Sequence, residues 1–241
     1  MGRLLDRHDV LFLQEVRGNT SDAELLAGEL NKHIVYSSHM QGGNYGGVMV
    51  AIKRSFLARF QDVVVVELLP GRVLRVILQA MNLTLNIINI HIDPTTDVPT
   101  KKHTISTIID HTTDETMTSF LIGDFNIPDE AEGRFHPRER RWIHSDRALS
   151  RWLGTMLDDF VELMQSDFTH KTIEGDEISV VSRIDRAFTN MNQLDLLDCA
   201  LLLVFGGISG LARWSPTTCL CPSNSLGMPA KPLPGGTSLT G

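Results

Sequence analysis

A carboxylate and an amide follow one apolar run closely enough to act together. Residues 120–122 form a short apolar run, which predicts a buried strand. Gly123 ends this strand, because glycine allows backbone conformations that a side chain would hinder. Residues two apart in an extended segment point the same way, so the side chains of Asp124 and Asn126 should converge on one site. Such a pair can orient water and hold a phosphate oxygen. An ordinary turn is the alternative interpretation, because Gly, Asp, Asn and Pro are all turn formers.

Two further acids come at the ends of predicted strands. Residues 9–16, DVLFLQEV, predict a strand that projects Glu15 at its C-terminal edge, where a carboxylate is a candidate metal ligand. A charge that keeps a strand edge soluble is the alternative for Glu15. Residues 182–188, SRIDRAF, carry Asp185 out of an apolar context. The sequence therefore predicts three strand-end acids.

A histidine joins these acids at the end of another predicted strand. Alternation along residues 83–92 puts Asn89 and His91 on one face of the strand and the neighbouring isoleucines on the other. A histidine at that position, followed by Asp93, can donate a proton at neutral pH or bond a phosphate oxygen. A histidine with a purely structural role is the alternative.

The elements that must position these side chains alternate between strands and helices. Residues 63–69, 73–81 and 83–92 predict three strands joined by short turns, an antiparallel meander. Apolar residues at helical spacing predict helices over residues 21–33 and 100–114. Further strands are predicted at 48–52, 168–172 and 178–181. This order predicts an α/β domain with layers of sheets and helices.

Length and charge limit the classes of protein. A chain of 241 residues with 42% hydrophobic side chains can bury a full core, and one α/β domain is the default at this length. The net charge of −7 argues against a generally basic nucleic-acid binder. Contact with a polyanion would then need a local basic patch or a bound cation, which points to a metal.

The remaining composition predicts a soluble, intracellular protein of the nucleus or cytoplasm. The N-terminal residues resemble neither a signal peptide nor a transit peptide. The longest apolar run, residues 199–212, is shorter than the ~18–20 residues that a membrane helix needs. Three cysteines lie late in the chain without zinc-like spacing and predict no disulfide framework: Cys199, Cys219 and Cys221.

Basic residues concentrate in one place, residues 134–151, with Trp142 and Trp152 among them. This stretch could contact a nucleic-acid backbone, with arginines on phosphates and tryptophans against bases or sugars. The solvated face of a helix is the alternative, because an apolar stripe of helical spacing runs from Leu149 to Leu157. The arginines that we select as candidate nucleic-acid contacts are Arg138, Arg140 and Arg141.

Five motifs in order resemble those of the endonuclease/exonuclease/phosphatase superfamily. They are LQE at 13–15, GGV at 46–48, the NIH and following Pro at 89–94, GDFN at 123–126 and SRID at 182–185. FTH at 168–170 before SRID is similar, more narrowly, to the endonuclease domains of non-long-terminal-repeat retrotransposons. The resemblance covers residues 8–192. It implies a two-sheet β-sandwich flanked by helices, a deoxyribonuclease-like four-layer sandwich, and hydrolysis of phosphate esters with Mg²⁺ or Mn²⁺.

The resemblance also implies a role for each matching residue. Glu15 would hold the metal, and His91 would contact the scissile phosphate. Asp124 would orient or deprotonate the attacking water, while Asn126 would help to hold the phosphate. Asp185 would orient a catalytic histidine further along the chain. Together these roles make a coherent hydrolytic site, because charge on the phosphate is neutralised while water is aligned for attack.

The sequence departs from the family pattern at both ends. Relatives begin with a strand that ends in a metal-site Asn, and no equivalent precedes Glu15 here. Relatives end with Ser-Asp-His, whereas no histidine follows Asp185. We therefore predict a fold incomplete at both ends, with a domain over residues 1–198 and an aberrant, disordered tail over 199–241. Residues 206–241 are rich in Gly, Pro, Ser and Thr without periodicity, a composition that predicts no packed strands.

One hypothesis for the tail is a frame-shifted form of the missing ending. With suitable codons, the bases that encode residues 215–222, SPTTCLCP, can encode an apolar residue followed by Ser-Asp-His when translated one nucleotide earlier. The transcript sequence tests this hypothesis directly.

The function predicted from these features is metal-dependent phosphodiester hydrolysis of the endonuclease type, retroelement-derived and impaired in this chain. Its partner would be nucleic acid, DNA in particular, with no membrane and no protein partner. A non-catalytic nucleic-acid-binding remnant is one alternative. A phosphodiesterase of the same superfamily that acts on phospholipid head groups is the other.

Overall fold

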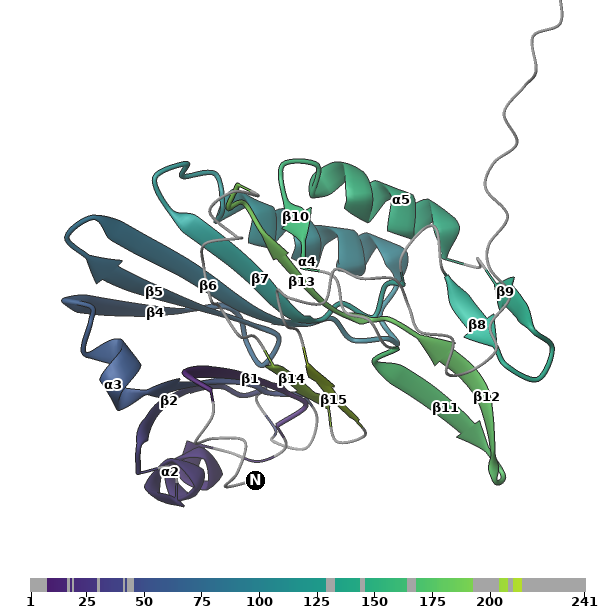
Figure 1. The fold of residues 1–241 in the computed structure, drawn as a ribbon, viewed down its shortest axis with the longest axis horizontal. Helices are drawn as coiled ribbons and strands as arrows, with labels where there is room; N and C mark the ends of the chain where they lie inside the picture. Colours follow the sequence, from purple (N-terminus) through teal and green to yellow (C-terminus); the bar gives the residue numbers. More distant parts are fainter. Residues whose placement is uncertain are drawn as a thin grey trace, which may run out of the picture.

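The meander predicted between residues 63 and 92 forms the middle of the molecule. The computed structural model describes residues 8–16, 18, 20–29, 31–40, 42, 46–128, 133–143, 146–163, 168–192, 204–207 and 210–213. The meander belongs to a six-stranded sheet (Figure 1). Its strands, in order across the sheet, are β10 (Val161–Glu162), β13 (Asp185–Thr189), β7 (Thr118–Asp124), β6 (Leu83–His91), β5 (Val73–Ala80) and β4 (Asp62–Leu69).

One helix explains the single parallel pair in this sheet. β6 and β7 are parallel, so the chain must cross over between them, and α4 (Val98–Asp110) makes that connection. The helix begins where the Asp97 side chain accepts a hydrogen bond from the backbone N–H of Thr100 at 2.9 Å. The helix predicted over residues 100–114 is confirmed, although it begins two residues earlier and ends four residues earlier.

A second, five-stranded sheet lies against the first. In order it contains β15 (Gly210–Arg213), β14 (Val204–Gly207), β1 (Val10–Gln14), β3 (Val48–Lys53) and β2 (His33–Ser38). β14 pairs parallel with β1, and β15 pairs antiparallel with β14. The prediction that residues 206–241 form no packed strands is therefore wrong for residues 206–207 and 210–213. The stretch 215–222 lies outside the described residues.

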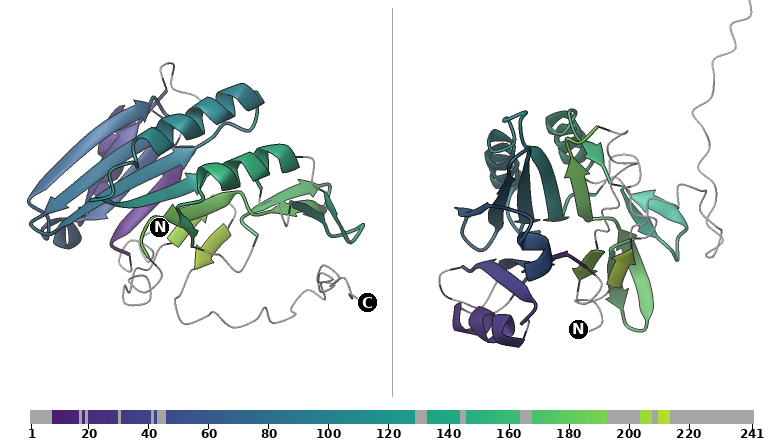
Figure 2. Two further views of the ribbon diagram at one scale, coloured as in Figure 1. Left: turned by 90° about the horizontal axis from the view of Figure 1, so that it is seen from above. Right: turned by 60° about the vertical axis from the view of Figure 1, so that its left-hand side comes forward.

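The molecule has four layers, as predicted from the family resemblance, and buried side chains join three of them (Figures 1 and 2). The core between the sheets contains Phe12, Val50 and Ile52 from the five-stranded sheet and Leu74, Val76, Ile87 and Ile122 from the six-stranded sheet. The other face of the six-stranded sheet packs against α4 and α5 (Arg147–Met156). α2 (Thr20–Glu29) covers the outer side of the five-stranded sheet (Figure 1).

A third sheet projects from one end of the sandwich (Figure 1). Its order is β11 (His170–Glu174), β12 (Glu177–Ser182), β8 (Arg134–His136) and β9 (Arg141–Ile143). The helix considered for residues 134–151 is therefore wrong for its first half, which forms the β8–β9 hairpin. The second half is α5, whose Leu149 and Leu153 are buried as the apolar stripe predicts.

The sequence analysis missed seven short elements. They are β2, α3 (Arg54–Leu57), β8, β9, β10, β14 and β15. In the part of the chain that the structure describes, none of the helices is both long and apolar enough to cross a bilayer.

Candidate active site

Three of the predicted site residues form a row across the six-stranded sheet. His91 ends β6, Asp124 ends β7 and Asp185 begins β13. His91 is the register partner of Asp124, and Asp124 is the register partner of Asp185. Because directly opposite residues place their side chains on the same face, the three side chains lie next to one another at one edge of the sheet. We call His91, Asp124 and Asp185 the row.

Glu15 reaches this row from the other sheet. It follows β1, and its Oε1 lies 3.6 Å from Nε2 of His91. The Glu15 side chain is 53% exposed, whereas the His91 side chain is 3% exposed. The carboxylate therefore faces solvent, and the imidazole is buried.

Asn89 connects the two sheets just behind Glu15. Its side-chain N–H₂ donates to the carbonyls of Leu13 at 3.1 Å and Met49 at 2.9 Å. Its carbonyl accepts from the Gln14 side chain at 2.6 Å. All these partners belong to the five-stranded sheet, so one buried amide fixes the position of β1 relative to β6. The prediction that Asn89 and His91 share a face is confirmed.

The GDFN turn holds Asp124 and Asn126 in place. The Asn126 backbone N–H donates to Asp124 Oδ1 at 2.8 Å, and its side-chain amide donates to the carbonyl of Ile92 at 2.7 Å. Asn126 has a φ of 48°, a left-handed conformation that asparagine tolerates well. A hydrogen bond from the Asn126 side chain also favours the ionised form of the Asp124 carboxyl. Asp124 and Asn126 thus converge as predicted, through a direct hydrogen bond.

The two aspartates of the row are costly to ionise together. Burial, the Asp185 charge and the Glu15 charge raise the pKa of Asp124 to about 8, although hydrogen bonds from Asn126 oppose the shift. Burial raises the pKa of Asp185 to about 6, against hydrogen bonds that include Thr169, and Glu15 adds to the rise. A divalent cation near these acids would lower the cost of ionising them.

His91 is held neutral by its surroundings. Burial and the nearby Arg72 guanidinium lower its pKa, while Glu15 and Asp93 act in the opposite direction. Arg72 Nη1 lies 3.0 Å from His91 Nδ1, and Arg72 Nη2 donates to Asp93 Oδ2 at 2.5 Å. Among the described residues, His91 Nε2 has no hydrogen-bond partner although it is buried. Arg72 and Asp93 were not selected from the sequence as site residues.

The FTH motif supplies another group that the sequence analysis did not place in the site. The Thr169 hydroxyl accepts from the backbone N–H of Ile184 at 3.1 Å and of Asp185 at 3.0 Å, so it fixes the start of β13. Burial and Arg134 lower the pKa of His170, and Glu15 raises it. His170 therefore lies within electrostatic range of Glu15. The position of FTH just before SRID was the sequence feature that could have placed Thr169 and His170 near the site.

The three candidate nucleic-acid contacts lie elsewhere, in the third sheet. Arg138 and Arg140 belong to the β8–β9 turn and Arg141 begins β9. Arg138 is exposed and lies 3.6 Å from Glu177, and Arg141 pairs with Glu139. Trp142 packs against Phe135 and Phe168. The structure thus does not bring these arginines to the row.

The carboxylates of the site fit a hard cation that is held by few protein ligands. Within the described residues, no group of three or more His, Cys, Asp or Glu side chains is arranged to hold a metal ion. Mg²⁺ keeps several waters and is usually bound through one or two carboxylates together with substrate phosphates. The exposed carboxylate of Glu15, beside two buried acids that ionise reluctantly, provides oxygen donors of that kind.

The sequence profile of the Endonuclease/Exonuclease/phosphatase family matches residues 1–215, and the chain belongs to this family. It is a hydrolase by family. No curated relative matches the chain in sequence.

Solved structures share the fold at low sequence identity. The endonuclease domain of TRAS1, a telomere-specific non-LTR retrotransposon, is 14% identical with a TM-score of 0.54, over 85% of this chain and 98% of that domain. The AP endonuclease LMAP from Leishmania major is 12% identical with a TM-score of 0.60, over 86% and 78%. The 3′ phosphatase NExo from Neisseria, bound to a product DNA hairpin, is 17% identical with a TM-score of 0.57, over 78% and 79%.

Proposed function

We propose that the chain hydrolyses phosphodiester bonds of nucleic acid, with DNA as the substrate, and that it does so as a metal-dependent endonuclease. The observation that carries this proposal is the row of His91, Asp124 and Asp185, faced by Glu15 from the other sheet. The row supplies a buried donor and two acids with raised pKa values, and Glu15 adds an exposed carboxylate. The pKa values of the two aspartates are raised, and that of His91 is lowered. Shifted pKa values at one place are typical of hydrolytic sites.

Each residue has a role that its surroundings support. Glu15 would hold Mg²⁺ or Mn²⁺, which when bound would neutralise charge on the phosphate oxygens. Asp124 has a pKa raised to about 8. In its deprotonated form, Asp124 would accept a proton from the attacking water. His91 would donate a hydrogen bond to the scissile phosphate, and Asn126, which bonds the Asp124 carboxylate, would help to hold the phosphate.

The proposal of DNA as the substrate is supported by the solved structures that share this fold. The similar structures include an endonuclease domain of a retrotransposon and a phosphatase bound to product DNA. The FTH–SRID ending supports a retroelement origin. Arg138, Arg140 and Arg141 on the projecting sheet would contact the backbone of a long substrate away from the cleaved bond.

Asp185 gives a reason to expect slow cleavage. In relatives the matching acid orients a catalytic histidine, but no histidine follows Asp185 in this sequence. Its surroundings include the Thr169 hydroxyl instead. Because acid–base and electrostatic groups each contribute about 10²–10³-fold to such reactions, we propose that the chain cleaves weakly.

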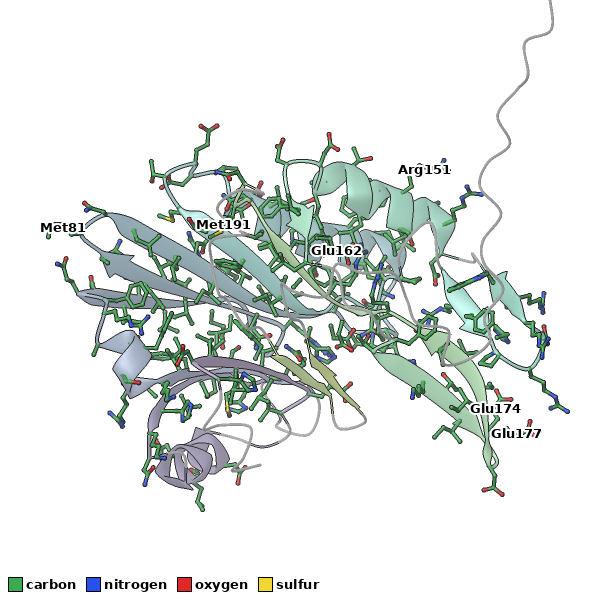
Figure 3. The ribbon with its side chains drawn as sticks, viewed as in Figure 1. Met81, Arg151, Glu162, Glu174, Glu177 and Met191 are labelled. Atoms are coloured by element: carbon green, nitrogen blue, oxygen red, sulfur yellow. The ribbon has the colours of Figure 1, made fainter. Side chains whose placement is uncertain are left out.

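Nicking of supercoiled plasmid DNA by the full chain tests the proposal. We expect slow nicking with Mg²⁺ or Mn²⁺, no nicking with EDTA, and a loss of at least about 100-fold in Glu15→Ala. The matched control is Glu174→Ala, whose carboxylate lies at the tip of the β11–β12 hairpin (Figure 3) and whose loss should leave nicking unchanged.

Three results would contradict the proposal. Nicking that survives in Glu15→Ala or in EDTA would come from another site or a contaminant. Binding of DNA without any nicking would favour the non-catalytic remnant. Faster hydrolysis of phosphoinositide or sphingomyelin head groups than of plasmid DNA would favour the phospholipid phosphodiesterase.

A further inference from the structure

We propose that Arg72 is a positioning residue that keeps the proton of the His91 imidazole on Nε2, so that His91 is a fixed hydrogen-bond donor to a phosphate oxygen. This inference rests on the proposed function for its catalytic consequence. Its structural part concerns Arg72 and His91 alone.

The contact between the two side chains allows one arrangement of protons. Arg72 Nη1 lies 3.0 Å from His91 Nδ1. A guanidinium has only N–H donors and no acceptor, so it can bond Nδ1 only through the lone pair of that nitrogen. An imidazole with a proton on Nδ1 would place two N–H groups against each other. The proton of the ring must therefore be on Nε2.

Several contacts hold Arg72 in that position. Its Nη2 donates to Asp93 Oδ2 at 2.5 Å, and the other oxygen of Asp93 accepts from the backbone and hydroxyl of Thr95 at 2.8 and 2.6 Å. The backbone N–H of His91 donates to the carbonyl of Arg72 at 2.8 Å, so the two residues face each other across the β5–β6 pair. Both ends of the contact are thus fixed.

The result is a buried donor that faces the site. His91 Nε2 is buried, lies 3.6 Å from Glu15 Oε1, and has no hydrogen-bond partner among the described residues. A buried polar group without a partner is costly, and a group that offers a permanent acceptor would remove that cost. A phosphate oxygen, which only accepts, fits an N–H that Arg72 keeps in place.

Arg75, in β5, belongs to a matched pair away from the site. Arg75 Nη1 lies 3.3 Å from Nδ1 of His111, and Arg75 Nε donates to Asn86 at 2.8 Å. The pair has the same chemistry as Arg72 and His91, but His111 follows α4 at the other end of the sheet. Arg75 therefore provides a control for the general effect of removing a half-buried arginine.

Long-range ¹H–¹⁵N correlation spectra of the ¹⁵N-labelled, metal-free chain test the proton position. His91→Gln identifies the His91 signals by their loss. We expect Nδ1 to be the unprotonated nitrogen of His91 in the parent chain and in Arg75→Gln, and a mixture of both neutral forms in Arg72→Leu. Arg72→Lys, which keeps a cationic donor, should retain the parent form. Arg72→Gln, which removes the charge as Arg75→Gln does, replaces Arg72→Leu if that variant fails to fold.

Plasmid nicking supplies the functional readout. We expect Arg72→Leu to lower kcat about 10–100-fold, as removal of a supporting hydrogen bond does elsewhere, with little change in KM. Arg75→Gln should change neither constant. A proton on Nδ1 in the parent chain, or an unchanged His91 signal in Arg72→Leu, overturns the inference even if nicking is normal. The expected spectra from a chain that never nicks support the placement of the proton and count against the proposed function alone.

Discussion

At the scale of single residues, the site contains backbone strain where chemistry is expected. Glu15 has a φ of 54°, and a glutamate in the left-handed region costs about 1–2 kcal/mol. The neighbouring backbone holds it there, because Val16 N–H donates to the carbonyl of Gly47 at 3.1 Å. A Cβ on Gly47 would lie 2.2 Å from the Val16 carbonyl oxygen. Gly47 thus permits the close approach that turns Glu15 away from the end of β1.

The charge of Asp124 leads to a prediction about stability and pH. An unfolded aspartate has a pKa of about 3.9, whereas that of folded Asp124 is raised to about 8. Between these values the folded chain binds more protons than the unfolded chain, so its stability falls as the pH rises. Asp124→Asn removes this loss and can still accept the Asn126 hydrogen bond.

We therefore expect Asp124→Asn to stabilise the metal-free protein by about 1–3 kcal/mol at about pH 8.5 and by much less at about pH 5. Urea unfolding in EDTA at the two pH values measures the difference. Asp159→Asn, an exposed residue after α5, is the control and should show no such pH difference. An equal effect of Asp124→Asn at both pH values would mean that Asp124 titrates normally.

At the scale of elements, strand direction decides which residues meet. The parallel pair β6–β7 brings the C-terminal residues His91 and Asp124 to one edge, and the antiparallel β13 brings its first residue, Asp185, to the same edge. The apolar runs and their terminal acids predicted the strands and the candidate residues. They did not predict that β13 pairs with β7, because pairing between distant strands depends on contacts that a local pattern does not contain.

Arg72 was predictable in principle. The turn between Ala80 and Leu83 has only two residues, and such a turn fixes the register of the whole hairpin. Counted back along both strands, that register places Arg72 opposite His91. The β8–β9 hairpin was harder to predict, because the arginines in residues 134–141 have no strong preference for strand over helix and its strands are three residues each.

Gly123 tests the importance of the β6–β7 approach. It has a φ of 146°, and a Cβ there would lie 1.9 Å from the carbonyl oxygen of Ile90. We expect Gly123→Ala to destabilise the protein by about 2–5 kcal/mol, because the substitution combines backbone strain with a clash against the neighbouring strand. Thermal and urea unfolding measure the loss.

Gly154, within α5, is the matched control because a Cβ there meets nothing within 4 Å. Gly154→Ala should stabilise the protein by about 0.5–1 kcal/mol through the helix preference of alanine. Equal effects of the two substitutions would contradict a close contact between β6 and β7 at Gly123.

At the scale of the whole molecule, the site is an interface between two sheets. Glu15 directly follows β1 of the five-stranded sheet, and the row belongs to the six-stranded sheet. The family resemblance predicted both sheets and the proximity of these residues. It did not predict that the fully buried Asn89 connects the two sheets, which follows from packing. Alternation showed only that Asn89 shares a face with His91; its partners on β1 and β3 could not be inferred from residues 83–92.

The last prediction separates this connection from general stability. Asn89→Ala would remove the hydrogen bonds to Leu13, Met49 and Gln14, and we expect a loss of about 2–4 kcal/mol. Asn86→Ala is the control, because Asn86 is equally buried in β6 but bonds His111 and Ser119 on the far side of the sheet. Both variants should lose similar stability.

Only Asn89→Ala should shift Glu15 relative to the row, so the Mg²⁺ affinity of this variant should fall about tenfold. The affinity is measured from the increase in the free energy of unfolding as the Mg²⁺ concentration rises. If both variants bind Mg²⁺ as the parent chain does, the metal site does not depend on the register between the sheets, and Glu15 would have to be positioned by its own strained backbone alone.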